Sequence, residues 1–260
     1  MKHSIIKVKS LFKILAVSVF WLALWQIASI IVGEELFFSS PIAVFRSLWQ
    51  MLSEKSFYAA LGNSFLRITV GFLISVVAGI IMAVISYLFP LLKTIFYPIA
   101  SIMKATPVVS FIILALIIFG SKNLATPISF IMVLPIIYTN TLTGIENTES
   151  DLLEMASVFN VSLTRKLKYI ILPSVMPFFI SGSAIAIGMC WKSGVAAEVI
   201  GLSANSLGKK IYESKIYLDI PELFAYTLVI ICVSVLFEKL FLFLMKKITK
   251  SIETGGDLNG

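Results

Sequence analysis

Polar and charged side chains interrupt the long apolar stretches of this chain, and they are its candidates for chemistry. If those stretches cross a bilayer, a charge at the centre costs about 2.5–3.5 kcal/mol, so each such residue requires an explanation. Lys104 is placed to contact a polar solute, unless its long side chain extends to the membrane surface. Lys192 and Glu198 stand six residues apart, and pairing between them is slightly favoured over contact with a solute. The candidates for a solute path are Lys104, Thr106, Ser110, Asn140, Trp191, Lys192 and Glu198.

Residue types needed for catalysis, metal binding or nucleotide binding lack the spacing that those functions require. The chain has a single histidine, His3, and neither a His-Glu-x-x-His motif nor an acidic pair inside the apolar stretches. Cys190 and Cys232 lie in apolar segments without Cys-x-x-Cys spacing, so we expect no metal site or disulfide framework. No Gly-x-x-x-x-Gly-Lys-Ser/Thr sequence is present to hold phosphates. We therefore expect a protein that is not an enzyme and that binds no cofactor itself.

The composition indicates a membrane protein. Of 260 residues, 58% are hydrophobic and 13% are charged, and the mean hydropathy is +0.98. A soluble domain averages about 25% charged residues, so this chain has too little polar surface to cover a globule in water. The net charge of +7 comes from lysines near the ends of apolar stretches, a distribution that fits the excess of basic residues on the cytoplasmic side of membranes. Nucleic acid is therefore not an expected partner, whereas the lipid bilayer is.

Apolar runs long enough to cross a membrane recur along the chain. They cover residues 11–32, 64–89, 97–119, 124–145, 171–191 and 223–245. At ~1.5 Å per residue each run can cross a core of ~30 Å, and because lipid offers no hydrogen bonds, the runs must be helical. The first run is longer than a signal-peptide core and no small-residue cleavage site follows it, so we expect it to be retained. The predicted fold is all-α, a single polytopic membrane domain over residues 1–260 with about six transmembrane helices.

Basic residues, prolines and amphipathic segments refine this topology. Lysine and arginine are more frequent on the side of the two termini than on the other side, which predicts that both termini are cytoplasmic. The lysines within 209–215 oppose this bias. Pro107 is expected to kink the third run. Two amphipathic segments, 41–52 and 206–216, are predicted to be helices at the outer surface, held by packing or by lipid contact.

The loop between the fourth and fifth runs, residues 148–173, is predicted to form two short helices on the cytoplasmic surface. Thr148 and Asp151 have capping-box spacing, so a helix is expected to start there. Asn160 tolerates a left-handed backbone, Ser162 can cap a second helix, and Pro173 suits the first turn of the next span. One apolar face recurs with helical spacing at Leu152, Ala156, Phe159, Leu163 and Leu167. Such a helix either lies among lipid headgroups or docks into a groove on a soluble partner.

The same loop carries a motif. Glu154 and Ala156 are followed by Asn160 and, after nine further residues, by residues 170–173 with the sequence Ile-Ile-Leu-Pro. This order resembles the EAA loop of permeases in binding-protein-dependent ABC importers of the type I fold, which reads Glu-Ala-Ala, three residues, Gly, nine residues, Ile-x-Leu-Pro. The chain departs from that pattern with Met155 for the first alanine and Asn160 for the glycine. Further segments resemble the nitrate/sulfonate/taurine branch of these permeases: residues 24–26, 39–41, 63–67, 105–107, 119–120 and 191–198.

The resemblance implies a set of partner proteins. In the family, two permease copies (here expected to be a homodimer) pair with two ABC ATP-binding subunits that hold ATP and Mg²⁺, and an extracytoplasmic substrate-binding protein delivers the solute. Glu154 is then expected to make a polar contact with the ATPase, apolar residues of the loop to fill the ATPase groove, and Asn160 to set the bend. The residues expected to couple the two proteins are Leu152, Glu154, Ala156, Phe159, Asn160, Leu172 and Pro173.

Alternatives remain for the solute and for the class of transporter. The branch that the chain resembles handles small anions such as nitrate, sulfonates and taurine, and its relatives import thiamine-precursor pyrimidines and other small organic molecules. A secondary transporter or channel without an ATPase is disfavoured, because intramembrane charges are few and no inverted repeat is visible. A vitamin-type energy-coupling scaffold would carry an Ala-Arg-Gly motif, which the chain lacks. The expected function is the multi-pass inner-membrane permease of an ATP-driven importer.

Overall fold

The computed structural model describes the backbone of residues 2–254 and the side chains of Lys13 and of residues 15–250. Met1 and residues 255–260 of the predicted domain lie outside the described residues, as do the side chains of His3 and of the first three lysines. The described elements are α1 (Lys2–Val32), α2 (Pro41–Met51), α3 (Lys55–Leu88), α4 (Pro90–Ala105), α5 (Val108–Phe119), α6 (Ala125–Glu146), α7 (Ser150–Val158), α8 (Leu163–Lys166), the π-helix η1 (Leu167–Ile171), α9 (Leu172–Gly201), α10 (Leu207–Ile216) and α11 (Ile220–Thr254).

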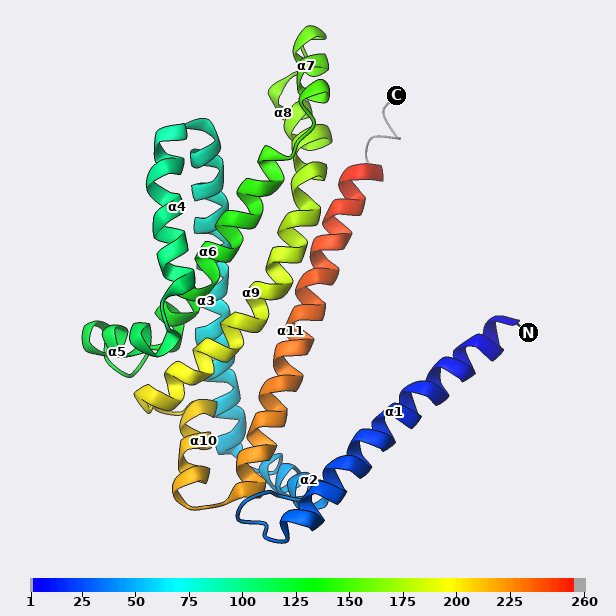
Figure 1. The fold of residues 1–260 in the computed structure, drawn as a ribbon, viewed down its shortest axis with the longest axis vertical. Coiled ribbons are helices and arrows are strands. Elements are labelled where there is room, and N and C mark those ends of the chain that lie inside the picture. Colours follow the sequence, from blue (N-terminus) through cyan, green and yellow to red (C-terminus); the bar gives the residue numbers. More distant parts are fainter. Residues whose placement is uncertain (1, 255–260) are drawn as a thin grey trace.

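The helices have the lengths that a membrane requires. In the part of the chain that is described, five helices are long and apolar enough to cross a bilayer, and the number rises to six if α4 and α5 together count as one broken span. The predicted all-α architecture with about six spans is therefore confirmed. α11 ends on the same side of the molecule as α7 and α8, whereas α2 and α10 lie at the opposite end (Figure 1).

The predicted third span is broken. Residues 97–119 do not form one kinked helix, because α4 and α5 meet at an angle of 104°. Pro107 restricts the residue before it to extended conformations, and Thr106 accordingly has φ −74° and ψ 132°. The helix therefore ends at Ala105, and α5 turns away from the axis of the bundle (Figure 1).

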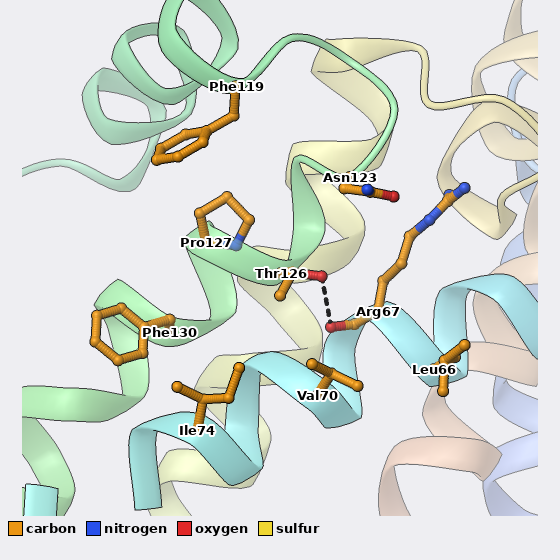
Figure 2. A pocket seen from close by; sticks show the side chains of 9 residues that line it. All are labelled: Leu66, Arg67, Val70, Ile74, Phe119, Asn123, Thr126, Pro127 and Phe130. Atoms are coloured by element: carbon orange, nitrogen blue, oxygen red, sulfur yellow. Dashed lines mark hydrogen bonds between the residues drawn. The ribbon is translucent and has the colours of Figure 1, made fainter. Parts of the chain in front are cut away.

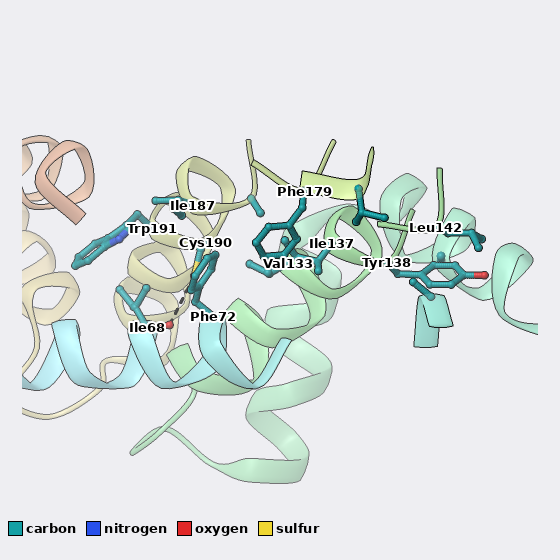
Figure 3. Packing of buried hydrophobic residues seen from close by; sticks show 14 of the residues in the cluster. Ile68, Phe72, Val133, Ile137, Tyr138, Leu142, Phe179, Ile187, Cys190 and Trp191 are labelled. Atoms are coloured by element: carbon teal, nitrogen blue, oxygen red, sulfur yellow. Dashed lines mark hydrogen bonds between the residues drawn. The ribbon is translucent and has the colours of Figure 1, made fainter. Parts of the chain in front are cut away.

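α6 forms the centre of the bundle and packs along both α3 and α9. Small residues permit this close approach: a Cβ atom on Gly71 of α3 would lie 2.5 Å from the carbonyl oxygen of Thr126 in α6. Apolar side chains of the three helices interdigitate in the core (Figure 3). The one hydroxyl among the labelled side chains belongs to Tyr138, and it lies 3.1 Å from the hydroxyl of Ser86, so its polar atom is satisfied inside the bundle.

The two predicted amphipathic helices are present as α2 and α10, and both are packed into the protein. Val44 of α2 and Leu207 of α10 are fully buried, and both helices contact α11. Serine side chains cap both N-termini: Ser40 accepts a hydrogen bond from the amide of Ala43 at 3.3 Å, and Ser206 accepts one from the amide of Lys209 at 3.1 Å. α1 touches the bundle near α2 and then leaves it, and most of its described apolar side chains are exposed (Figure 1).

Candidate coupling surface and solute path

The segment between α6 and α9 projects beyond the rest of the bundle as a helical hairpin (Figure 1). α7 begins after Glu149, whose side chain makes no capping hydrogen bond. Thr148 is buried, and its hydroxyl donates to the carbonyl of Gly144 at 3.5 Å. The predicted capping box between Thr148 and Asp151 is therefore wrong, because the threonine closes the last turn of α6 instead.

Asn160 forms the bend of the hairpin. Its φ of +49° lies in the left-handed region that the sequence predicted. The next amide, that of Val161, donates to the carbonyl of Ala156 at 2.9 Å and folds the chain back over the end of α7. Ser162 directly precedes α8 as predicted, but its side chain makes no capping hydrogen bond. The predicted order of helix, turn and helix is present.

Apolar side chains cover the outermost part of this hairpin, which we call the hairpin tip. The tip consists of Met155, Val158, Phe159 and Leu163, and the last three are each more than 70% exposed. Leu152 and Glu154 are exposed beside it. Ala156 was expected in the same apolar surface, but it is only 2% exposed because the returning chain covers it. Contiguous exposed apolar side chains at such a projection are typical of a contact site.

A π-helical turn joins the hairpin to the bundle. η1 contains one more residue per hydrogen-bonded turn than an α-helix, a feature that is frequent at functional sites. Leu172 and Pro173 follow it as the first residues of α9, and Pro173 lies in the first turn as predicted. The hairpin is therefore continuous with a long helix of the core.

Lys104 lies in the last turn of α4, and its ammonium group donates to the hydroxyl of Thr139 in α6 at 2.9 Å. Both residues line a cavity of about 480 Å³ between the two helices. Lys93 and Glu146 line the same cavity and form an ion pair with each other at 2.5 Å. Two lysines against one glutamate leave a net positive charge, which favours an anionic ligand.

The other path candidates are divided among different environments. Trp191 and Lys192 line a second cavity, of about 390 Å³, which α11 and Ile211 of α10 also border. The indole nitrogen of Trp191 is buried and has no hydrogen-bond partner among the described residues. Asn140 donates its amide to the carbonyl of Ile136 at 2.8 Å and packs against α9. Thr106, which follows the last residue of α4, donates its hydroxyl to the carbonyl of Ile102, and Ser110 is exposed in the first turn of α5.

Glu198 does not pair with Lys192, contrary to the sequence expectation. Six residues correspond to about 240° around an α-helix, so the two side chains point to different faces. Glu198 is fully buried, and one carboxylate oxygen accepts hydrogen bonds from the hydroxyl of Ser64 at 2.7 Å and from the amide of Gly208 at 3.2 Å. Its other oxygen lies 3.8 Å from the guanidinium of Arg67. This cluster joins α3, α9 and α10, and in this conformation Glu198 does not face an open path.

Arg67 also borders the largest cavity described, of about 690 Å³, which lies between α3, α6 and the end of α5 (Figure 2). The guanidinium donates to the carbonyl of Ala204 at 3.3 Å, and the backbone carbonyl of Arg67 accepts from the hydroxyl of Thr126 at 3.0 Å. Asn123 also lines the cavity, and aliphatic and aromatic side chains form the rest of the wall (Figure 2). Hydrogen bonds within the protein therefore fix both the guanidinium and the backbone carbonyl of Arg67.

Comparison with known proteins identifies the fold and the hairpin as parts of a transporter. Residues 75–254 match the family described as binding-protein-dependent transport system inner membrane component. The chain belongs to this family. The matched region includes the hairpin, η1 and all of α9. The protein is thus an inner-membrane permease subunit of an ABC importer, and a transport subunit rather than a catalytic one.

Several curated permeases are similar to this one over most of its length. The nitrate import permease protein NrtB of Synechococcus elongatus is 26% identical over 69% of this chain and 68% of its own length. The putative aliphatic sulfonates transport permease protein SsuC of Bacillus subtilis is 21% identical over 88% and 83% of the two chains. The taurine transport system permease protein TauC of Escherichia coli is 24% identical over 82% and 80%. A chain of the inward-facing MetNI methionine ABC transporter matches with a TM-score of 0.51, 16% identity and coverage of 75% of this permease and 93% of that chain, which supports the fold.

The sequence did not identify three groups that the structure places at these sites. Thr139 approaches Lys104 only because α4 and α6 lie side by side, and Ser64 and Arg67 reach Glu198 from more than 130 residues away along the chain. Val158 is one residue from the expected apolar stripe, and its exposure follows from the bend at Asn160. No local spacing signals such contacts. Among the described residues, no cluster of histidine, cysteine or acidic side chains could hold a metal ion.

Proposed function

We propose that this permease imports a small solute carrying an oxyanion group, and that an ABC ATP-binding subunit drives transport by docking on the hairpin tip. The observation that carries the proposal is the exposed apolar surface at the tip, next to Glu154 of the EAA-like loop. Apolar anchors in the centre of a contact, with a charged residue beside them, are the usual composition of a docking site.

Docking at the tip offers a mechanical route into the membrane. Movement of α7 and α8 is transmitted through η1 to α9, because Leu172 directly continues the π turn into that helix. α9 packs along the central helix α6, whose residue Thr139 contacts Lys104 at the polar cavity. Closure of an ATP-binding pair against the tip would therefore move the walls of the cavity as connected rigid elements.

Basic residues support the assignment of sides. Arg165, Lys166 and Lys168 lie in α8 and η1, at the end where α11 also finishes. An excess of basic residues marks the cytoplasmic side, so the hairpin and the C-terminus are assigned to the cytoplasm. The opposite end, with α2 and α10, would then receive an extracytoplasmic binding protein. We further propose that a second copy of this permease completes the path, because α4 and α5 expose large apolar side chains such as Ile102 and Ile117.

The polar cavity supports an anionic solute. Its lysines outnumber its single glutamate, and Lys104 contacts a neutral hydroxyl in place of a carboxylate. Similar permeases are named for nitrate, aliphatic sulfonates, taurine and bicarbonate, each of which carries an oxyanion group. Lys104 is therefore the first choice for a residue that contacts the solute, ahead of Lys192 in the second cavity.

Co-purification tests the docking site. The full chain is expressed with a candidate ABC ATP-binding subunit from the same organism, as wild type, as Phe159→Asp and as the control Phe37→Asp. Both phenylalanines are more than 70% exposed, and Phe37 lies beyond the C-terminal end of α1. Loss of an aromatic anchor costs about 2–4 kcal/mol at a contact, so Phe159→Asp should retain little ATPase and Phe37→Asp should retain all of it. Equal retention by both variants would remove the tip from the interface, and no association with wild type or either variant would show that this ATP-binding subunit is not the partner.

The same preparations, reconstituted with the binding protein, test the path. Lys104→Gln should reduce ATP-dependent uptake while the ATPase remains bound, because the substitution removes the positive charge and leaves the hairpin intact. Lys122→Gln, in the connection between α5 and α6, is the matched control. Unchanged uptake by Lys104→Gln would exclude this lysine from the solute path.

A further inference from the structure

An apolar cavity of about 380 Å³ lies beside the π turn that joins the hairpin to the bundle. Its walls come from five elements: α3, α6, α8, η1 and the start of α9, and all of these except α3 belong to the proposed coupling route. The side chains lining it include Ile80, Val84, Leu167, Ile171 and Leu172. Because almost all of its surface is carbon, ordered water would find few hydrogen-bond partners there.

Basic and hydroxyl groups stand at one side of this cavity. Thr164 and Lys168 both line it, and they are four residues apart on one face of the α8–η1 segment. Lys168 is exposed, and its ammonium lies 5.1 Å from the centre of the Tyr169 ring. Within residues 13 and 15–250, neither Lys168 nor its neighbour Arg165 has a carboxylate within ion-pair distance. A tyrosine beside basic side chains is typical of the headgroup level of a membrane.

We propose that this cavity binds one acyl chain of an anionic phospholipid, with the phosphate of the headgroup on Lys168 and Thr164. Val84, Leu167 and Leu172 are each more than a third exposed, so the cavity opens toward the surface that lipid covers. The apolar interior matches an acyl chain, and Lys168 at its edge, which has no carboxylate within ion-pair distance among the described side chains, matches a negative headgroup. A lipid without net negative charge could place an acyl chain in the apolar interior, but it would not neutralise the charge of Lys168 at the edge.

A lipid bound in this cavity would affect the mechanical coupling between the hairpin and the bundle. Leu167 and Ile171 belong to the π turn, and they share the cavity with Ile80 of α3. A seated acyl chain therefore packs against both sides of the joint and stabilises one angle between hairpin and bundle. The site is distinct from the hairpin tip and from the cavity at Lys104, so it can exist even if the proposed ATPase docking or solute path is wrong.

Native mass spectrometry of the full chain tests the site. The purified protein is equilibrated with equal amounts of phosphatidylglycerol and phosphatidylcholine, and the lipids that remain bound are counted. Lys168→Gln should lower the bound phosphatidylglycerol by about five-fold, the factor expected for one basic residue near a headgroup. Val84→Phe, which fills the cavity, should lower it at least as much. The controls are Lys247→Gln in α11 and Val77→Phe on α3, which are exposed and do not line this cavity.

Three results would overturn the proposal. The first is equal retention of the two lipids by the wild type, and the second is unchanged phosphatidylglycerol on both Lys168→Gln and Val84→Phe. The third is a cross-linked dimer, which would show that a second copy of the chain occupies the cavity. To test for it, the variant Val84→Cys in a Cys232→Ser background is treated with a bifunctional maleimide in liposomes. Cys190 is buried, so Val84→Cys is the site of reaction. A cross-linked dimer would assign the cavity to the partner copy, and the proposal expects a labelled monomer.

Discussion

Gly71 of α3 lies where the central helix approaches most closely, and Gly71→Ala should destabilise the permease. A Cβ atom at this position would lie 2.5 Å from the carbonyl oxygen of Thr126 and 2.7 Å from the Cβ atom of Ser129, both in α6. A backbone oxygen cannot move as a flexible side chain can, so the helices must separate. That separation loosens the packing that also holds α9 against α6.

The magnitude follows from a matched control on the same helix. Gly62 has no heavy atom within 4 Å of the position that its Cβ would take, so Gly62→Ala shows the effect of helix propensity alone, a gain of about 1 kcal/mol. Gly71→Ala has the same gain and an overpacking cost of about 1–3 kcal/mol. The propensity contribution cancels in the comparison, so Gly71→Ala should be less stable than Gly62→Ala by the overpacking cost, about 1–3 kcal/mol.

Thermal unfolding of the full chain in detergent micelles measures this difference. For a chain of this size, it corresponds to an apparent Tm lower by roughly 2–12 °C for Gly71→Ala than for Gly62→Ala. Equal unfolding temperatures for the two variants would refute the reasoning that contact between Gly71 and α6 limits the stability of the bundle.

Two further predictions concern Glu198 and Asn160. Glu198→Gln should lower the free energy of unfolding by about 1–3 kcal/mol, because it weakens buried hydrogen bonds that have no access to water. The control is the partly exposed Glu213, which forms ion pairs with Lys209 and Lys210. Glu213→Gln should change the free energy of unfolding by less than about 1 kcal/mol in the same thermal assay. Equal shifts would contradict the buried network. Asn160→Val should cost about 1–2 kcal/mol in the left-handed region and reduce retention of the ATP-binding subunit, whereas Asn160→Gly should retain it as well as wild type; full retention by the valine variant would show that the bend is not needed for docking.

The sequence predicts features that depend on depth in the membrane or on local backbone preference. Apolar run length gave the spans, and the left-handed tolerance of Asn160 gave the bend that the structure contains. Contacts between distant segments were not predictable in this way. Glu198 was expected to form an ion pair with Lys192 because the two residues are close in sequence, but its hydrogen-bond partners come from α3 and α10. Thr148 fitted a capping box, yet its hydroxyl donates to the carbonyl of Gly144 in the last turn of the preceding helix, and α7 begins only at Ser150.

The break at Pro107 explains why Lys104 is a better candidate for solute contact than its sequence position suggests. In a continuous helix over 97–119, this lysine would lie in the interior of a span, where a charge is costly. The helix instead ends one residue later, at Ala105. The last carbonyls of a helix carry partial negative charge and are not satisfied within it, which stabilises a cation in the last turn. The proline that interrupts the span therefore also lowers the cost of holding a positive charge beside Thr139, in a cavity large enough for a small anion.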